Sequence, residues 1–213
     1  QVLKLSEPNE SFADVLDVLD QGVESVREML NSLLDLSRLE SGAERVELLS
    51  VDISGVLHGL AAQFQPTACE RGLTLATEGP EELFVETDPK KIRRIAQNLI
   101  LNSLAHTTSG EVRLSWALEG PRWRMCVADT GPGIQDIVGS PVATQLNDPE
   151  QHALPSGLGQ RGGYHGEGIG LSIVKRLCDL LGAGISLKSE VGRGSTFTLE
   201  FPLGYADGDP SGE

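Results

Sequence analysis

Two glycine-rich motifs constrain this chain more than any other feature. They are the stretch from Asp129 to Ile134, which reads DTGPGI, and the stretch from Gly166 to Leu171, which reads GEGIGL. Glycine permits turns that other residues resist, and it lets backbone N–H groups approach phosphate oxygens without a Cβ in the way. A predicted helix that carries two asparagines precedes both motifs. In this order, the three features predict a pocket for a nucleoside triphosphate.

The composition permits a packed core and limits the partners. With 213 residues, of which 39% are hydrophobic, the chain can form one ordinary domain with an extension or two small domains. Its 31 acidic and 17 basic side chains give a formal net charge of −14. This balance argues against a nucleic-acid or anionic-membrane surface, where basic patches supply most of the affinity. A site for a polyanion must therefore be built locally, from backbone dipoles, a metal ion and a few cations.

The cysteines and the hydropathy pattern bear on the compartment. Cys69, Cys126 and Cys178 are far apart and lack the spacing of metal ligands, so we expect buried thiols in a reducing compartment. No apolar run approaches the roughly 18 residues of a membrane-spanning helix, and no signal sequence opens the chain. We expect a cytoplasmic segment, which can also be the cytoplasmic portion of a membrane-bound protein.

The amino-terminal part has the pattern of a bundle helix. From Phe12 to Leu33, apolar residues alternate spacings of four and three, which is a heptad seam of about three repeats. The predicted helix ends near Gly42, since glycine suits a carboxy-terminal cap. We therefore divide the chain into a helical region at 1–45, a second domain at 46–204 and a disordered acidic tail at 205–213.

The second domain is predicted to mix strands and helices. Asp88 and Pro89 form a strong helix start, an acidic N-cap followed by proline at the first helical position. Residues 134–165 show no clean period and are rich in glycine, proline and small polar residues, which predicts a long mobile loop, or lid. The other expected elements are strands at 48–51, 73–76, 83–86, 111–118, 123–129, 185–190 and 195–201, and helices at 53–71, 88–106 and 171–181.

Asn98 and Asn102 are four residues apart, so both side chains lie on one face of the predicted helix. An isolated pair of this kind would be surface or capping residues. Their position upstream of two glycine motifs favours a functional role instead. Because amide oxygens suit a hard cation, we predict Asn102 as the Mg²⁺ ligand, with Asn98 assisting or ordering water.

The two glycine motifs suggest complementary roles. Asp129 ends a strand, and its carboxylate is predicted to accept a hydrogen bond from the adenine N6 amine; the alternative is a plain turn. Glycines of the second motif precede a helix whose N–H groups would meet phosphates, although a hinge would look the same. The motif glycines concerned are Gly131, Gly133, Gly166, Gly168 and Gly170.

These stretches resemble the N, G1, G2 and G3 boxes of sensor histidine kinases. The matching segments are 98–102 (NLILN), 129–133 (DTGPG), 166–175 (GEGIGLSIVK) and 192–197 (GRGSTF), and residues 34–42 (LDLSRLESG) resemble the end of the second helix of the family's dimerisation and phosphotransfer domain. The resemblance covers nearly the whole chain. It implies an α+β fold, a Bergerat-type two-layer α/β sandwich, preceded by a long helix of a hairpin that dimerises into a four-helix bundle.

The resemblance also implies roles for single residues and for the reaction. Asp129 would contact adenine, with support from Ser195, and Asn102 would hold Mg²⁺. The G2 glycines and Leu171 would border the triphosphate of ATP. Related hydrolases such as gyrase and the Hsp90 chaperones carry a water-activating glutamate at the position of Asn98, and an amide cannot act as a general base. This difference favours transfer of the γ-phosphoryl group to a histidine, for relay to a response regulator.

The chain departs from the family at the phosphate acceptor. None of its histidines lies in the acceptor context of the family: they are His58, His106, His152 and His165. Counting back from residues 34–42, the acceptor should precede Gln1. We therefore expect a truncated chain that cannot autophosphorylate in the usual way.

Further departures concern the lid and the phosphates. Ala105 occupies the position of a phosphate-contacting lysine, the lid lacks a phenylalanine-rich F box, and residues 134–160 contain no lysine or arginine. We expect weaker nucleotide binding as a result. Arg161 and His165 are candidate replacements, with His106 a further candidate contact, although solvated loop residues are the alternative. These losses keep open a second function, a degenerate ATP-binding and dimerisation module that regulates another kinase without phosphotransfer.

Overall fold

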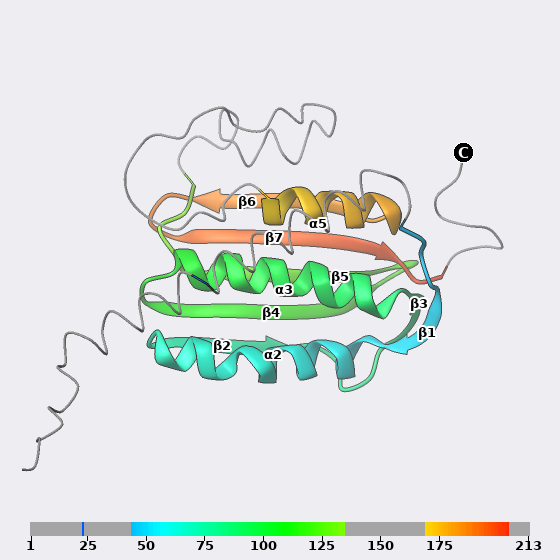
Figure 1. Ribbon diagram of the computed structural model, residues 1–213, viewed down its shortest axis with the longest axis horizontal. Coiled ribbons are helices and arrows are strands. Elements are labelled where there is room, and N and C mark those ends of the chain that lie inside the picture. Colours follow the sequence, from blue (N-terminus) through cyan, green and yellow to red (C-terminus); the bar gives the residue numbers. More distant parts are fainter. Residues whose placement is uncertain (1–22, 24–43, 135–168, 205–213) are drawn as a thin grey trace, which may run out of the picture.

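The computed structural model describes residues 23, 44–134 and 169–204. Helices α2, α3 and α5 cover one face of a five-stranded sheet, which gives a two-layer α/β sandwich (Figure 1). The predicted fold class is therefore confirmed for this part of the chain. Apart from residue 23, the expected helix at 12–42 lies outside the described residues, as do the tail and nearly all of the lid. The elements are β1 (Leu49–Asp52), α2 (Ile53–Glu70), β2 (Leu73–Glu78), β3 (Phe84–Thr87), α3 (Pro89–His106), β4 (Gly110–Glu119), β5 (Arg122–Asp129), α5 (Ile169–Leu180), β6 (Gly184–Glu190) and β7 (Gly194–Pro202).

The main sheet has the strand order β2-β4-β5-β7-β6. Strand β2 runs parallel to β4, and the other neighbours are antiparallel. Alternation along each strand separates the two faces: on β5, Trp123, Met125 and Val127 are buried, whereas Arg124 and Cys126 are only partly covered. The buried set faces the three helices and forms the core, while β1 and β3 pair as a separate two-stranded sheet.

Side-chain caps fix where the first two helices begin. Asp52 accepts hydrogen bonds from the backbone N–H groups of Ser54 and Gly55, and this starts α2. Asp88 does the same for α3, with Pro89 at the first helical position, as the sequence predicted. Helix α2 continues past Pro66 to Glu70. No helix in the described residues is both long enough and apolar enough to span a bilayer.

The prediction of three buried thiols was wrong. Only Cys178 is buried, and burial raises the pKa of its thiol to about 12. Cys69 is exposed because it lies on the outer side of the last turn of α2, next to the buried Ala68. Cys126 is half-buried because it lies on the sheet face that the helices do not cover.

A charged cluster fastens the segment before β1 to the start of α3. The ammonium group of Lys91, whose side chain is 6% exposed, lies 3.1 Å from Glu44 Oε1 and 3.3 Å from Asp88 Oδ2. It also donates to the carbonyl oxygen of Arg45 at 2.9 Å. The backbone N–H of Glu47 donates to Asp88 Oδ2 at 3.0 Å. Residues 44–47 are therefore held against the amino-terminal end of α3.

The carboxylate of Asp88 makes this cluster sensitive to acid. Burial alone would raise its pKa, but hydrogen bonds from the backbone of Glu47 and Lys91, together with the Lys91 charge, outweigh burial and lower the pKa below 3.8. The folded state then binds this proton less readily than the unfolded state does. The stability from this carboxylate is complete above the ordinary pKa and is lost as the pH falls through the lower folded value.

Two adjacent lysines provide a matched test of the cluster. Lys91→Met removes the partner of a buried acid, so we expect the free energy of unfolding to fall by about 3 kcal/mol. Lys90→Met removes only the exposed pair with Glu47, whose side chains are 83% and 62% exposed, and the change should stay below about 0.5 kcal/mol. Urea unfolding of both variants measures the difference. Equal losses would contradict the assignment of Lys91 as the anchor.

Candidate functional site

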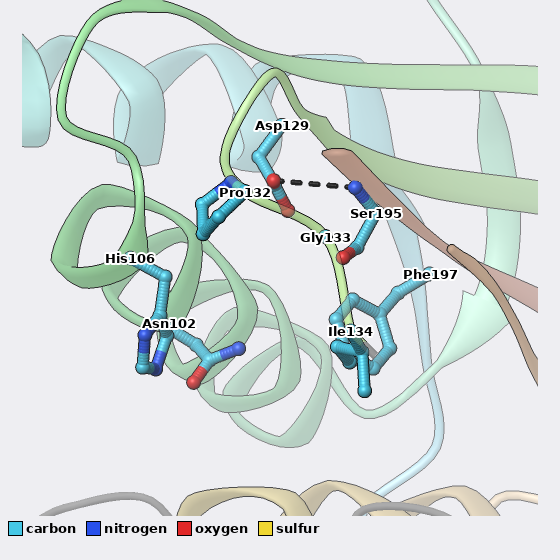
Figure 2. A pocket seen from close by; sticks show the side chains of 8 residues that line it. All are labelled: Asn102, His106, Asp129, Pro132, Gly133, Ile134, Ser195 and Phe197. Atoms are coloured by element: carbon cyan, nitrogen blue, oxygen red, sulfur yellow. Dashed lines mark hydrogen bonds between the residues drawn. The ribbon is translucent and has the colours of Figure 1, made fainter. Parts of the chain in front are cut away.

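A solvent-open pocket of about 180 Å³ lies between the carboxy-terminal half of α3 and the adjoining ends of β5 and β7. Figure 2 shows Asn102 and His106 on one side of it, and Ile134 and Phe197 on another. The lining residues are Asn102, His106, Asp129, Pro132, Gly133, Ile134, Ser195 and Phe197.

Five of the predicted site residues meet in this pocket. Asn102 and His106 come from α3, Asp129 ends β5, Gly133 follows it in the first glycine motif, and Ser195 lies near the start of β7. Antiparallel pairing puts Ser195 directly opposite Asp129, although the two residues are 66 positions apart in sequence. The pocket is thus assembled by the sheet register from distant parts of the chain.

One oxygen of Asp129 is held by the protein backbone. Its Oδ1 accepts a hydrogen bond from the N–H of Gly131 at 2.9 Å. It also accepts one from the N–H of Ser195 at 3.2 Å, which Figure 2 shows. The Oδ2 atom accepts no hydrogen bond from any residue that the structure describes. Burial raises the pKa of this carboxyl, although the two hydrogen bonds and the charge of His106 act in the opposite direction. The carboxylate is thereby oriented, with one oxygen left to accept from a ligand.

Glycines hold the loop after Asp129 against the turn between β6 and β7. A Cβ on Gly194, where φ is +110°, would lie 1.9 Å from the carbonyl oxygen of Asp129. A Cβ on Gly133, where φ is +70°, would lie 2.3 Å from the carbonyl oxygen of Glu190. The backbone N–H of Gly192 also donates to the carbonyl oxygen of Pro132 at 2.8 Å. These close approaches require glycine, and they give the pocket a wall that rests on the hairpin.

Asn98 does not line the pocket that the described residues form. Its Nδ2 donates to the backbone carbonyl of Arg94 at 2.8 Å. Its Oδ1 lies 3.2 Å from the place that a Cβ on Gly170 would occupy, so the amide packs against the first turn of α5. Leu171, in the same turn, is 4% exposed and belongs to the core. The other predicted residues, Gly166, Gly168, Arg161 and His165, lie outside the described part of the chain.

The side chains of the pocket fit a cation that a bound ligand also coordinates better than a cation held by protein groups alone. In residues 44–134 and 169–204, no group of three or more histidine, cysteine, aspartate or glutamate side chains could hold a metal. Asn102 lines the pocket, and its amide makes no hydrogen bond to the residues described there. Mg²⁺ commonly takes one or two protein oxygens and completes its shell with substrate phosphates and water. A single amide side chain in the pocket fits this pattern.

Three lining residues were not predicted from the sequence. Pro132 and Ile134 belong to the first glycine motif, and Phe197 follows Ser195 by two positions, so both side chains point to the same face of β7. The alternation of β7 was the available signal for Phe197. For Ser189, whose hydroxyl contacts both Ile134 and Ser195, the sequence offered no sign.

Comparison with known families agrees with this geometry. Residues 87–205 match the model of the family described as histidine kinase-, DNA gyrase B- and HSP90-like ATPases. The chain therefore belongs to this family. Within it, the similar proteins are sensor histidine kinases, and the domain is of the histidine kinase type.

Individual relatives show how much of the chain is shared. The autoinducer 2 sensor kinase/phosphatase LuxQ of Vibrio parahaemolyticus is 30% identical over 95% of this chain, which spans 24% of LuxQ. The crystal structure of full-length ShkA in complex with AMPPNP has a TM-score of 0.70 and 27% identity, and the match covers 98% of this chain and 42% of ShkA. The histidine kinase ThkA in complex with the response regulator TrrA shares the fold, with a TM-score of 0.62, 18% identity, and coverage of 94% of this chain and 54% of ThkA. The chain thus spans well under two thirds of these relatives.

Proposed function

We propose that this chain is the ATP-binding catalytic portion of a sensor histidine kinase. The observation that carries the proposal is the oriented carboxylate of Asp129, which has one oxygen fixed by two backbone N–H groups and the other left to accept from a ligand. An exocyclic amine of adenine is a ligand group of the right kind. The complex of ShkA with AMPPNP, a relative with the same fold over 98% of this chain, supports an adenine nucleotide as that ligand.

The roles of the remaining residues follow from their positions. Asn102, on the opposite side of the pocket from the strand ends, would offer its amide oxygen to Mg²⁺, and the bound ion would neutralise charge on the phosphates. His106 lies one turn further along α3 and lines the same pocket, so it would be a further contact to the nucleotide. The N–H groups at the start of α5 would face the phosphates, with Gly166, Gly168 and Gly170 as the predicted phosphate-bordering residues.

Asn98 supports transfer over hydrolysis. Its amide nitrogen is engaged by the carbonyl of Arg94, and an amide cannot remove a proton from water in any case. The γ-phosphoryl group would therefore pass from ATP to an imidazole nitrogen, leaving ADP. None of the four histidines in the sequence lies in the acceptor context, so we propose that the acceptor belongs to another segment or molecule and that this chain alone does not autophosphorylate.

The partners follow from the same proposal. A response regulator would take the phosphoryl group onward, and the complex of ThkA with TrrA, which has the same fold, supports such a partner. Residues 1–45 would form part of a homodimeric helical bundle, and the kinase would work in the cytoplasm. The second candidate, a degenerate module without phosphotransfer, rests on Ala105, on the missing F box and on the absence of lysine and arginine from residues 134–160.

Calorimetric titration tests the binding step. A non-hydrolysable ATP analogue should bind with micromolar to millimolar affinity in the presence of Mg²⁺, and more weakly when EDTA removes the cation. Asn102→Ala should remove most of the Mg²⁺ dependence and leave the fold intact. Absence of any binding at millimolar nucleotide would reject the proposal. Phosphate incorporation into a separately supplied helical hairpin with an acceptor histidine would then distinguish the kinase from the degenerate module.

A further inference from the structure

A third strand contributes to the pocket through Ser189 of β6. Strand pairing aligns Ser189 with Ser195 of β7, and Ser195 with Asp129 of β5, so the three residues form one row across the sheet. The Ser189 hydroxyl accepts from the backbone N–H of Ile134 at 2.7 Å and donates to the carbonyl oxygen of Gly194 at 3.1 Å. It also lies 2.9 Å from the hydroxyl oxygen of Ser195.

Counting protons fixes the direction of the last of these bonds. A serine hydroxyl has one proton to donate and two lone pairs that accept. The carbonyl oxygen of Gly194 can only accept, so the Ser189 hydroxyl is the donor in that hydrogen bond. One lone pair of Ser189 receives the N–H of Ile134, and the other is left for Ser195. All three hydrogen bonds form together only if the Ser195 hydroxyl is the donor in its hydrogen bond to Ser189.

When Ser195 donates to Ser189, its hydroxyl has no proton left with which to donate to a ligand. Its hydroxyl oxygen then offers only lone pairs to the pocket, next to the free oxygen of Asp129. Two neighbouring acceptors attract an amino group, and they repel a carbonyl oxygen in the same place. A pocket built to hydrogen-bond one group discriminates strongly against an analogue that leaves its polar atoms unpaired.

We propose that Ser189 is a positioning residue that sets the base preference of the nucleotide site. Its hydroxyl does not touch the base. It accepts a hydrogen bond from the Ser195 hydroxyl, so that Asp129 and Ser195 present only acceptors to the pocket. It also accepts from the backbone N–H of Ile134 and holds that residue in place. The site would thereby select a purine that carries an exocyclic amine over one that carries a carbonyl. This inference rests on the proposed nucleotide-binding function.

ATP and ITP form a matched pair of probes, since hypoxanthine has a carbonyl oxygen where adenine has its amine. The wild-type protein should bind ATP at least ten-fold more tightly than ITP in calorimetric titrations with Mg²⁺. In Ser189→Ala, the Ser195 hydroxyl is free to turn and donate. The affinity for ATP should fall and that for ITP should hold or rise, so that their ratio narrows about ten-fold, equivalent to about 1.4 kcal/mol.

Two further variants separate positioning from a structural role. Ser189→Thr keeps the hydroxyl, suits a strand, and should restore the ATP-to-ITP ratio. Ser186→Ala, an exposed position of the same strand, should leave both affinities unchanged. Equal weakening of both nucleotides in Ser189→Ala would show a merely structural serine and overturn the inference, as would a wild-type protein that binds ATP without preference over ITP. If the wild type binds neither nucleotide, the proposed function fails and this inference fails with it.

Discussion

Replacing Asp129 by asparagine is expected to weaken ATP binding on the order of 100-fold while leaving the folded domain at least as stable. The asparagine oxygen can still accept the N–H groups of Gly131 and Ser195, so the local fold keeps its hydrogen bonds. The second oxygen, however, is replaced by an amide NH2 group, a donor that faces the donor amine of adenine. A lost hydrogen bond to a charged group is worth about 1.5–3 kcal/mol, and the repulsion adds to it. Calorimetric titration measures the affinity.

The stability of the same variant should change with pH in a defined direction. Burial raises the pKa of Asp129 above 3.8, so the folded state binds this proton more readily than the unfolded state. The wild type therefore gains stability from this group as the pH falls through the raised folded pKa towards the ordinary value. Asp129→Asn lacks this gain. The difference in melting temperature between the variant and the wild type should therefore shrink as the pH falls.

Glu200→Gln provides the control for net charge. Glu200 is an exposed residue of the same strand as Ser195, and its neutralisation should leave nucleotide affinity unchanged. An Asp129→Asn protein that binds ATP as tightly as the wild type would remove Asp129 from the adenine site. If the Asp129→Asn protein unfolds at neutral pH, the charge of Asp129 instead stabilises the fold.

Gly194→Ala should reduce the free energy of unfolding by about 3 kcal/mol or more. The backbone of Gly194 has φ of +110°, which is strained for any L side chain, and a Cβ there would meet the carbonyl oxygen of Asp129 at 1.9 Å. Because the atoms that this Cβ would meet belong to the backbone, relief requires β7 to move away from β5. Nucleotide binding should fall together with stability, since the same shift separates Ser195 from Asp129.

Gly192→Ala is the matched comparison for this variant. Gly192 also has a positive φ, +79°, but a Cβ there would meet no atom within 4 Å. Only the conformational penalty remains, and we expect a loss of about 1 kcal/mol. Chemical denaturation of the two variants tests the crowding argument. Similar losses at both positions would mean that the strands adjust freely around a methyl group at residue 194.

Local signals in the sequence located most elements of the described domain. The acid and proline at Asp88 and Pro89 begin a helix where expected, because capping depends on residues that are adjacent in the chain. Alternation of buried and exposed residues likewise predicted β4 and β5 to within two residues. The fold class depended on the order of the motifs and their resemblance to a known family.

Features that join distant segments were not predictable from local pattern. Nothing near Lys91 identifies Glu44, 47 positions away, as its partner, and the apolar surroundings that bury the lysine come from tertiary packing. Ser189 reads as an ordinary polar residue of an edge strand, and its role depends on the register between β6 and β7. Local pattern also did not show that the amide of Asn98 packs against the first turn of α5, whereas Asn102 lines the pocket.

The pairing of Asp129 with Ser195 across 66 positions also has a consequence for synthesis on the ribosome. Strand β5 pairs with β4 as soon as both are made, but its other edge has no partner until β7 emerges. At about 5–20 residues per second, this edge waits roughly 3–13 s. During that interval a nascent chain exposes an unpaired strand edge, the kind of surface that recruits other strands. ATP cannot shield it, because the nucleotide pocket does not exist before its last strand is made.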